Sequence, residues 1–271
     1  MNEIFKYRAP TTRAELYGLL ADHGDGARVL AGGTDLLVDI RSGLVQPEMV
    51  INLKKVDDFA GLSWSQEDGL VIGPAVTVNE VLDDATVQNR YPLLAECALT
   101  LASHQLRNRA TVVGNITHAS PGADMAPGLL CLGARAVIGS QRGRREVELK
   151  DFFTGVKQTV LNTDEVVEAI VVPAGTAGSL GSYRKLKRID GHDLSLVGVA
   201  LTKKDGAMNL SIASAAPTPL LIEGLVVGDS ADAVVAAARE VIRPISDLRC
   251  SKEYRQFMIE VYIRRLLEEV Q

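Results

Sequence analysis

The sequence predicts an α+β protein, with helices and strands mixed along its first part and a meander of strands followed by two helices at its end. Three observations predict this. Thr12–Glu15 has the spacing of a capping box and precedes leucines at helical intervals. Residues 165–173 form a valine-rich run that ends at a proline. Three further strand patterns then precede two helical ones.

The elements of the first part follow in order. We expect a helix from Thr12 to about His23. Residues 28–33 predict a short buried strand that ends at a glycine pair, and Met49–Leu53 predicts a second strand. Thr77–Glu80 is another capping box that begins a helix, and residues 92–105 have the leucine and alanine spacing of a core helix.

Helical signals weaken in the middle of the chain. Ala110–Pro127 mixes glycine, asparagine, serine and two prolines with small apolar residues, so we expect strand and loop there rather than helix. Residues 135–139 and 145–153 predict a hairpin, and we interpret the basic run Arg142–Arg145 as its solvated tip. The Gly-rich run 174–182 is the best candidate for a domain boundary.

The last third of the chain predicts three strands and two helices. The strands are residues 182–188, 194–202 and 207–216, with Lys203–Gly206 as a turn. The helices are Ala231–Ile242 and Ser251–Val270. The second helix is expected to bury a face made of Phe257, Val261, Leu266 and Leu267.

Composition and charge exclude several classes of protein. The 271 residues include 29 Lys and Arg against 34 Asp and Glu, a net charge of −5, and the basic residues are scattered. A nucleic-acid partner is therefore not expected, because it requires clustered cations. No stretch reaches the ~20 apolar residues of a membrane span. The N-terminus lacks the apolar core of a signal peptide, so we expect a cytoplasmic protein.

Residues that ligate metals or act as nucleophiles are few and far apart. The cysteines are Cys97, Cys131 and Cys250, and the histidines are His23, His104, His118 and His192. Their number and spacing predict neither disulfides, a CxxC iron–sulfur site nor a zinc site. No GxSxG elbow or other nucleophile context is present. We assign no catalytic residue and no metal ligand to this chain.

Leu30–Asp35 departs from the packing pattern because a strand runs into Gly32-Gly33, a hydroxyl and a carboxylate. A glycine pair permits positive φ and lets a ligand approach the main chain closely. Successive N–H groups in such a turn form a nest that binds phosphate oxygens. The same residues also fit a simple tight turn, and the residues alone leave both interpretations open.

Thr111–Pro127 is the second unusual segment, rich in hydrogen-bonding side chains and poor in residues that fill a core. A polar ligand would satisfy such a stretch if it were buried. A structural loop capped by its own serine, asparagine and aspartate fits equally. Neither glycine segment matches GxGxxG or GxxxxGK[ST], so the residues do not predict a dinucleotide fold of the Rossmann type or a P-loop.

Four segments together resemble one family. They are AGGTDLLVDIR (31–41), RNRATVVGNITHASPGADMAP (107–127), LKDFFTGVKQTVLNTDEVVEAIVVP (149–173) and YRKLKR (183–188). The family is the medium, FAD-binding subunit of molybdenum hydroxylases, which include xanthine dehydrogenase and aerobic carbon monoxide dehydrogenase. The resemblance is collinear from Tyr7 to the final helix. Two separated glycine motifs in the right order make it more specific than one motif.

The resemblance implies a domain organisation. A vanillyl-alcohol-oxidase (PCMH) type FAD-binding domain would occupy residues 1–175, with subdomains at about 1–56 and 57–175. A smaller C-terminal α+β domain would occupy residues 176–271. FAD would lie in the cleft between these parts.

The resemblance also implies the residues that bind FAD. Main-chain N–H groups of the first motif would wrap the pyrophosphate; its residues are Arg28, Val29, Leu30, Ala31, Gly32, Gly33, Thr34 and Asp35. The second motif would approach from the other side with Thr111, Val112, Val113, Gly114 and Asn115. Asp124 would bind the adenosine ribose, and Leu101, Val167 and Lys185 would contact the flavin or adenine.

The sequence departs from the family pattern at two places. The family usually has two glycines before the asparagine of the second motif, and here the first is Val113, whose Cβ is expected to crowd the pyrophosphate. The family's YRKLKR segment is usually followed closely by an aspartate. Ile189–Asp193 leaves that register ambiguous here, and with it the assignment of Lys185.

The resemblance implies an electron-transfer subunit of a heterotrimer that can dimerise. Its partners would be a molybdopterin large subunit and a small subunit with two [2Fe–2S] clusters, and electrons would leave FAD for NAD or a quinone. Three alternatives remain. They are a stand-alone FAD-dependent oxidoreductase, a flavin-free scaffold subunit, for which Val113 is the hint, and a binding module without a redox role.

Overall fold

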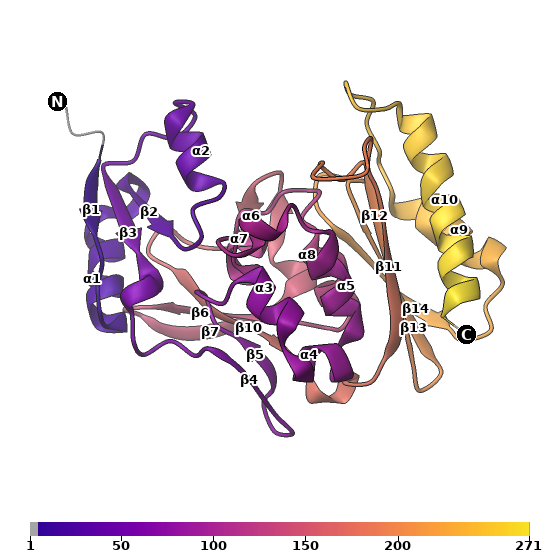
Figure 1. Ribbon diagram of the computed structural model, residues 1–271, viewed down its shortest axis with the longest axis horizontal. Coiled ribbons are helices and arrows are strands. Elements are labelled where there is room, and N and C mark those ends of the chain that lie inside the picture. Colours follow the sequence, from indigo (N-terminus) through magenta and orange to yellow (C-terminus); the bar gives the residue numbers. More distant parts are fainter. Residues whose placement is uncertain (1–4, 271) are drawn as a thin grey trace.

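Three sheets follow one another along the long axis of the molecule in the computed structural model, which describes residues 5–270. Figure 1 shows the first sheet near the N-terminus, the second in the centre and the third near the C-terminus. A layer of short helices packs between the second and third sheets. Helices α5 (Pro92–Thr100) and α8 (Met125–Cys131) contact strands of the third sheet, while α7 (Val112–Thr117) contacts β10 (Val166–Val172) of the second. Two longer helices cover the outer face of the third sheet (Figure 1).

The first sheet is parallel, with the order β1-β3-β2. Its strands are β1 (Lys6–Arg8), β3 (Met49–Asn52) and β2 (Ala27–Leu30). The predicted helix is confirmed as α1 (Arg13–His23), and the Thr12 side chain accepts a bond from Glu15 N. A second helix, α2 (Leu36–Arg41), follows the first glycine segment and was not predicted. Leu16, Leu20 and Ile51 belong to the apolar core of this sheet.

The second sheet is antiparallel, with the order β4-β5-β10-β6-β7. Its strands are β4 (Leu62–Ser65), β5 (Gly69–Ile72), β10 (Val166–Val172), β6 (Arg135–Ser140) and β7 (Gly143–Glu148). All seven residues of β10 are buried, which explains why its sequence is apolar at every position except Glu168. A small ribbon of β8 (Phe153–Gly155) and β9 (Gln158–Thr159) lies outside this sheet.

The predicted β6–β7 hairpin is confirmed with a solvated basic tip, whose exposed arginines also form ion pairs. Arg142 pairs with Asp164 at 2.8 Å, Arg144 Nε lies 2.6 Å from Glu168, and Arg145 Nη2 lies 2.8 Å from Glu165. These acidic partners come from the β9–β10 region, some twenty residues away in sequence, so the sequence pattern did not show them.

The helical layer corrects the prediction for Ala110–Pro127. This segment forms two short helices, α7 (Val112–Thr117) and α8 (Met125–Cys131), instead of strand and loop. The Thr111 side chain caps α7 by accepting from Gly114 N, and every residue of α8 is buried. Burial thus overrides the low helix propensity of glycine and asparagine, and Pro127 is tolerated in the first turn of α8.

The remaining helices of this layer are α3 (Val78–Asp83), α4 (Ala85–Arg90), α5 (Pro92–Thr100) and α6 (His104–Arg107). The predicted Thr77–Glu80 capping box is present in full at the start of α3. The helix predicted over residues 92–105 is interrupted between α5 and α6, where Ala102 has a φ of 46°.

The third sheet is an antiparallel meander of β11 (Leu180–Leu186), β12 (Val197–Lys204), β13 (Ala207–Ala213) and β14 (Leu220–Val226). The three predicted strands are confirmed, and β14 was missed. Helices α9 (Ala231–Val241) and α10 (Lys252–Glu269) pack on it. β11 begins at Leu180, within the Gly-rich run 174–182, and the domain boundary placed in that run stays a prediction.

The buried face of α10 differs from the predicted one. Phe257 is 60% exposed, and the residues inside are Arg255, Ile259, Tyr262, Ile263 and Leu266. The prediction counted only apolar residues, whereas this face begins with a buried arginine in the first turn of α10. Arg255 donates to Asp247 at 2.8 Å and to the main-chain oxygen of Leu196 at 2.5 Å. Because these hydrogen bonds satisfy its guanidinium, Arg255 can occupy a position on the buried helix face that an apolar residue would otherwise fill.

We expect Glu165 to contribute to the free energy of unfolding in a way that is lost in acid. Its carboxylate accepts two bonds from Arg145, which hold its pKa low, at about 2. A depressed carboxyl pKa stabilises the fold above the unfolded value of 4.5 and loses that contribution as the pH falls toward 2. Glu165→Gln should cost about 1–3 kcal/mol at neutral pH and flatten the loss of stability below pH 4.5. Urea unfolding across this range measures both effects. Glu67→Gln, at an exposed site, is the control, and an equal acid slope in both variants would contradict the assignment.

Candidate functional site

The first glycine segment forms a turn directly after β2. Gly33 has a φ of 75°, the left-handed region that glycine adopts without strain. None of the four main-chain N–H groups from Gly32 to Asp35 donates to a main-chain acceptor within residues 5–270. Consecutive N–H groups in a turn with one left-handed residue form a concave site for anions. The turn therefore has the geometry of a phosphate nest.

The two glycine segments meet at Gly32. A Cβ at this position would lie 2.1 Å from the main-chain oxygen of Arg109 and 3.0 Å from the Cα of Ala110. Only glycine permits so close an approach of one main chain to another. A second contact joins the same segments, because His118 Nε2 lies 3.7 Å from Asp35 Oδ1. The structure thus brings together the two motifs that the sequence separates by about eighty residues.

The second glycine segment begins α7, and some of its main-chain N–H groups donate within that helix. Gly114 N donates to Thr111 Oγ1 at 3.0 Å, and Asn115 N donates to Thr111 O at 3.0 Å. The Asn115 side chain accepts from Met125 N at 3.2 Å and so ties α7 to α8. Val113 is 4% exposed and belongs to the largest apolar core, together with Val112. Its Cβ is therefore part of the protein interior.

Asp124 and Lys185 form one polar unit between the helical layer and the third sheet. Lys185 Nζ lies 2.8 Å from Asp124 Oδ2 and also donates to Thr100 O at 3.2 Å. Tyr183 OH donates to Asp124 Oδ1 at 3.3 Å. Burial raises the pKa of the Asp124 carboxyl above its usual value, and the Lys185 ammonium opposes that rise. Two residues that the sequence placed separately on the cofactor thus contact each other.

Leu101 and Val167 are buried. Leu101 is 6% exposed and ends α5, where Arg107 donates to its main-chain oxygen at 2.9 Å. Val167 is 1% exposed within β10, next to a bulge in the pairing with β6. The role of both residues in cofactor binding stays a prediction. Because both side chains are buried, any contact with the cofactor would come from the edge of the apolar core.

Comparison with known proteins decides the family. Residues 3–175 match the family described as the FAD binding domain in molybdopterin dehydrogenase. The chain belongs to this family. The match covers both glycine segments, and it confirms the family that the sequence resembles, together with FAD as the cofactor.

Full-length relatives of this FAD-binding family agree. The chain is 34% identical to the carbon monoxide dehydrogenase medium chain of Hydrogenophaga pseudoflava, over 97% of this chain and 96% of that protein. It is 28% identical to the xanthine dehydrogenase FAD-binding subunit of Escherichia coli O157:H7, over 99% and 97%. The chain is thus an FAD-binding medium subunit of molybdenum hydroxylase type, an oxidoreductase flavoprotein.

Solved structures confirm the predicted fold class. A chain of carbon monoxide dehydrogenase from Hydrogenophaga pseudoflava superposes with a TM-score of 0.90 at 33% identity, over 98% of this chain and 96% of that one. A chain of quinoline 2-oxidoreductase from Pseudomonas putida 86 gives a TM-score of 0.87 at 28% identity, over 98% and 96%. The α+β, PCMH-type architecture expected from the resemblance is therefore correct. Within residues 5–270, no helix is both long and apolar enough to cross a bilayer.

The structure fits the cofactor of this family at the Gly32–Asp35 turn. The pyrophosphate of FAD is an anion. The turn offers main-chain N–H groups that donate to no main-chain acceptor within residues 5–270, and no side chain at Gly32 covers them. Val113 lies in the apolar core, and its effect on the pyrophosphate stays a prediction. Sequence reasoning missed Tyr183 because its bond to Asp124 joins residues on different elements.

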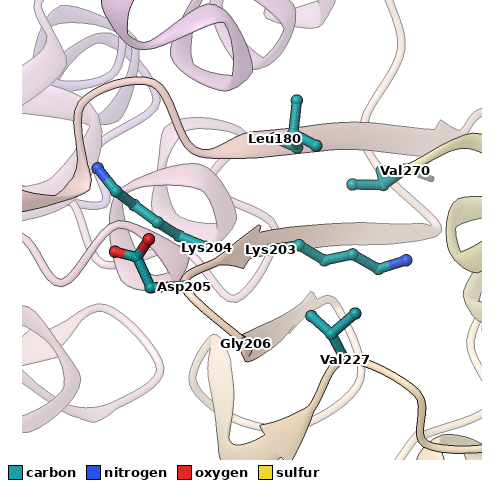
Figure 2. Close-up of a pocket in the computed structure, with 7 residues that line it drawn as sticks. All are labelled: Leu180, Lys203, Lys204, Asp205, Gly206, Val227 and Val270. Carbon is teal, nitrogen blue, oxygen red and sulfur yellow. The ribbon is translucent and has the colours of Figure 1, made fainter.

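A separate cavity lies at the end of the third sheet, around the β12–β13 turn. Its volume is about 370 Å³, and Leu180, Val227 and Val270 form its apolar walls. Figure 2 shows that the Lys204 side chain runs away from Val270; its ammonium group donates to Ala177 O. None of the predicted cofactor residues lines this cavity.

Gly32→Ala tests the approach of the two segments. The new Cβ would meet a main-chain oxygen at a distance that real contacts do not reach, so the turn must shift. We expect the Kd for FAD to rise at least about tenfold, a loss of about 1.4 kcal/mol. Titration by flavin fluorescence measures the Kd. Gly61→Ala, where a Cβ meets open space, is the control. An unchanged Kd in Gly32→Ala would show that the cofactor does not use this turn.

Proposed function

We propose that this chain is the electron-transfer subunit of a molybdenum hydroxylase. It would take electrons from [2Fe–2S] clusters in a small subunit and deliver them to an external acceptor such as NAD or a quinone. A large subunit with the molybdopterin would oxidise the organic substrate. The observation that carries the proposal is the meeting of the two glycine segments at Gly32, because it forms a cofactor site without a catalytic side chain.

The first motif, from Arg28 to Asp35, would hold the pyrophosphate through the turn that follows β2. The N–H groups of Gly32 to Asp35 would donate to phosphate oxygens, and the missing Cβ of Gly32 allows the turn to lie against residues 109–110. The second motif, Thr111 to Asn115, would face the same group from α7. When bound, FAD supplies the redox chemistry, and the protein supplies binding and orientation.

Asp124 and Lys185 would hold the rest of the cofactor in place. A lysine ammonium has three donors, and two of those of Lys185 are used, for Asp124 and for Thr100 O. One donor remains for a cofactor atom. Asp124 keeps acceptor capacity for a ribose hydroxyl beside its bonds from Lys185 and Tyr183. This pair also ties the third sheet to the helical layer, so cofactor and sheet would share one anchor.

The partner subunits follow from the division of chemistry. Among residues 5–270 no group of three or more His, Cys, Asp or Glu side chains is placed to hold a metal. We therefore propose that the clusters and the molybdenum belong to other chains, in a heterotrimer that can dimerise. The relatives support this, because their names describe medium chains and FAD-binding subunits.

The deciding experiment is purification of the chain from its own cells with whatever subunits accompany it. The visible spectrum, the released cofactor, bleaching by dithionite, and the iron and molybdenum content would be measured. FAD, iron and molybdenum in one complex would support the proposal. FAD in an isolated chain that oxidises a substrate would favour the stand-alone oxidoreductase. A complex without flavin would favour the scaffold subunit, and a flavin that cannot be reduced would favour the binding module.

Asp124→Asn tests the polar unit. The amide keeps the shape of the carboxylate but removes the charge that pairs with Lys185. We expect FAD binding to weaken by about 1.5–3 kcal/mol, the value of a hydrogen bond to a charged group. Equilibrium dialysis with FAD measures the change, and Asp22→Asn, on the exposed surface of α1, is the control. Equal affinity in the two variants would limit Asp124 to a role in packing the third sheet.

A further inference from the structure

Lys54 reaches the first glycine segment because two parallel strands end side by side. Strand β2 ends at Leu30, and the Gly32 turn follows it. Leu30 is paired with Asn52, the last residue of β3, and Lys54 follows two residues later. The carboxyl ends of parallel strands lie at the same edge of a sheet, which is where ligands bind in open sheets. Residues that follow β3 therefore lie beside the residues that follow β2.

The contact of Lys54 with the turn is direct. Its Nζ donates to the main-chain oxygen of Ala31 at 2.5 Å, one residue before Gly32. The Asn52 side chain accepts from Lys54 N at 3.1 Å and shapes the short helical turn that carries the lysine. One of the three ammonium donors is thus used, and two remain for a ligand on the turn.

Arg109 brings a second cation to the same turn from the other side. Its main-chain oxygen is the atom that Gly32 approaches. Its charge also reaches Lys54, because partial burial and then repulsion by Arg109 hold the pKa of Lys54 below its ordinary value. Two cationic residues, one after β3 and one before α7, therefore adjoin the turn that carries the N–H groups of Gly32 to Asp35.

Neither cation has a counter-charge among the residues that the structure describes. Within residues 5–270, no carboxylate lies in ion-pair distance of Lys54 or Arg109, although the chain as a whole carries a net charge of −5. The carboxylate in the turn itself, Asp35, lies 3.7 Å from His118 Nε2 and accepts from Thr34 Oγ1. Two like charges held together without a partner oppose each other, so an anion between them gains from both.

We propose that Lys54 and Arg109 bind the two phosphates of the FAD pyrophosphate, one from each side of the Gly32 turn. The inference rests on the proposed function, because it takes the turn as the pyrophosphate site. The main-chain nest would then position the phosphates, and the two side chains would supply the opposite charge. They are binding residues that favour ligands with a pyrophosphate over those with a single phosphate.

Salt dependence separates charge pairing from simple support of the turn. Wild type, Lys54→Met, Arg109→Gln and the double variant of the full chain, with any co-purifying subunits, would be titrated with FAD at increasing NaCl. Each single variant should raise the Kd about tenfold at low salt. Each should also reduce the slope of log Kd against log salt, because an exposed charge pair is screened by ions. Lys54→Arg should restore most of both.

Lys55→Met is the matched control. Lys55 is the next residue on the short helical turn that carries Lys54, and this substitution removes the same charge. Displacement of FAD by ADP and AMP adds a readout that does not depend on the flavin. Wild type and the control should prefer ADP by about tenfold, and the double variant should lose this preference.

The outcomes are distinct. If Lys54→Met and Arg109→Gln match the control in Kd, salt slope and ADP preference, this inference is overturned while the proposed function stands. If the variants lose affinity but keep the wild-type salt slope and ADP preference, Lys54 only supports the turn and the inference is also overturned. If the wild-type chain binds no FAD, both this inference and the proposed function are overturned.

Discussion

The close approach of Gly32 to the main chain of Arg109 and Ala110 is the constraint on which the site depends. It joins the turn after β2, at the first sheet, to the segment that begins α7, in the helical layer, and these belong to different apolar cores. A side chain at this position would separate the two segments. This single contact between main chains brings the N–H groups of the turn, Arg109 and the cap of α7 to one place.

The helical layer has a comparable role for the other end of the site. α5 and α8 pack between the second and third sheets, and their core includes Tyr183 and Ala200 from the third sheet. Asp124 precedes α8 and Lys185 lies on β11, so their ion pair closes across this layer. The buried carboxylate is costly without its partner, which makes the pair a condition for docking the third sheet.

Errors in predicting the fold have a common cause. α7 and α8 contain glycine, asparagine and proline, which local propensity assigns to loops, yet both helices form because they are buried on the second and third sheets. The buried face of α10 includes Arg255, which an apolar pattern cannot identify, because its partners Asp247 and Leu196 come from other segments. In each case distant residues supplied the burial or the hydrogen bonds.

The sequence by itself determined the family, the cofactor, the strands and helices with strong periodicity, and the two glycine motifs, because these depend on local spacing and collinear order. Only the tertiary structure decided that Val113 lies in the core, that Asp124 pairs with Lys185, and that Lys54 and Arg109 both adjoin the first turn. The reason is physical. Periodicity reports which face of an element is buried, whereas the charge around a ligand depends on which elements meet.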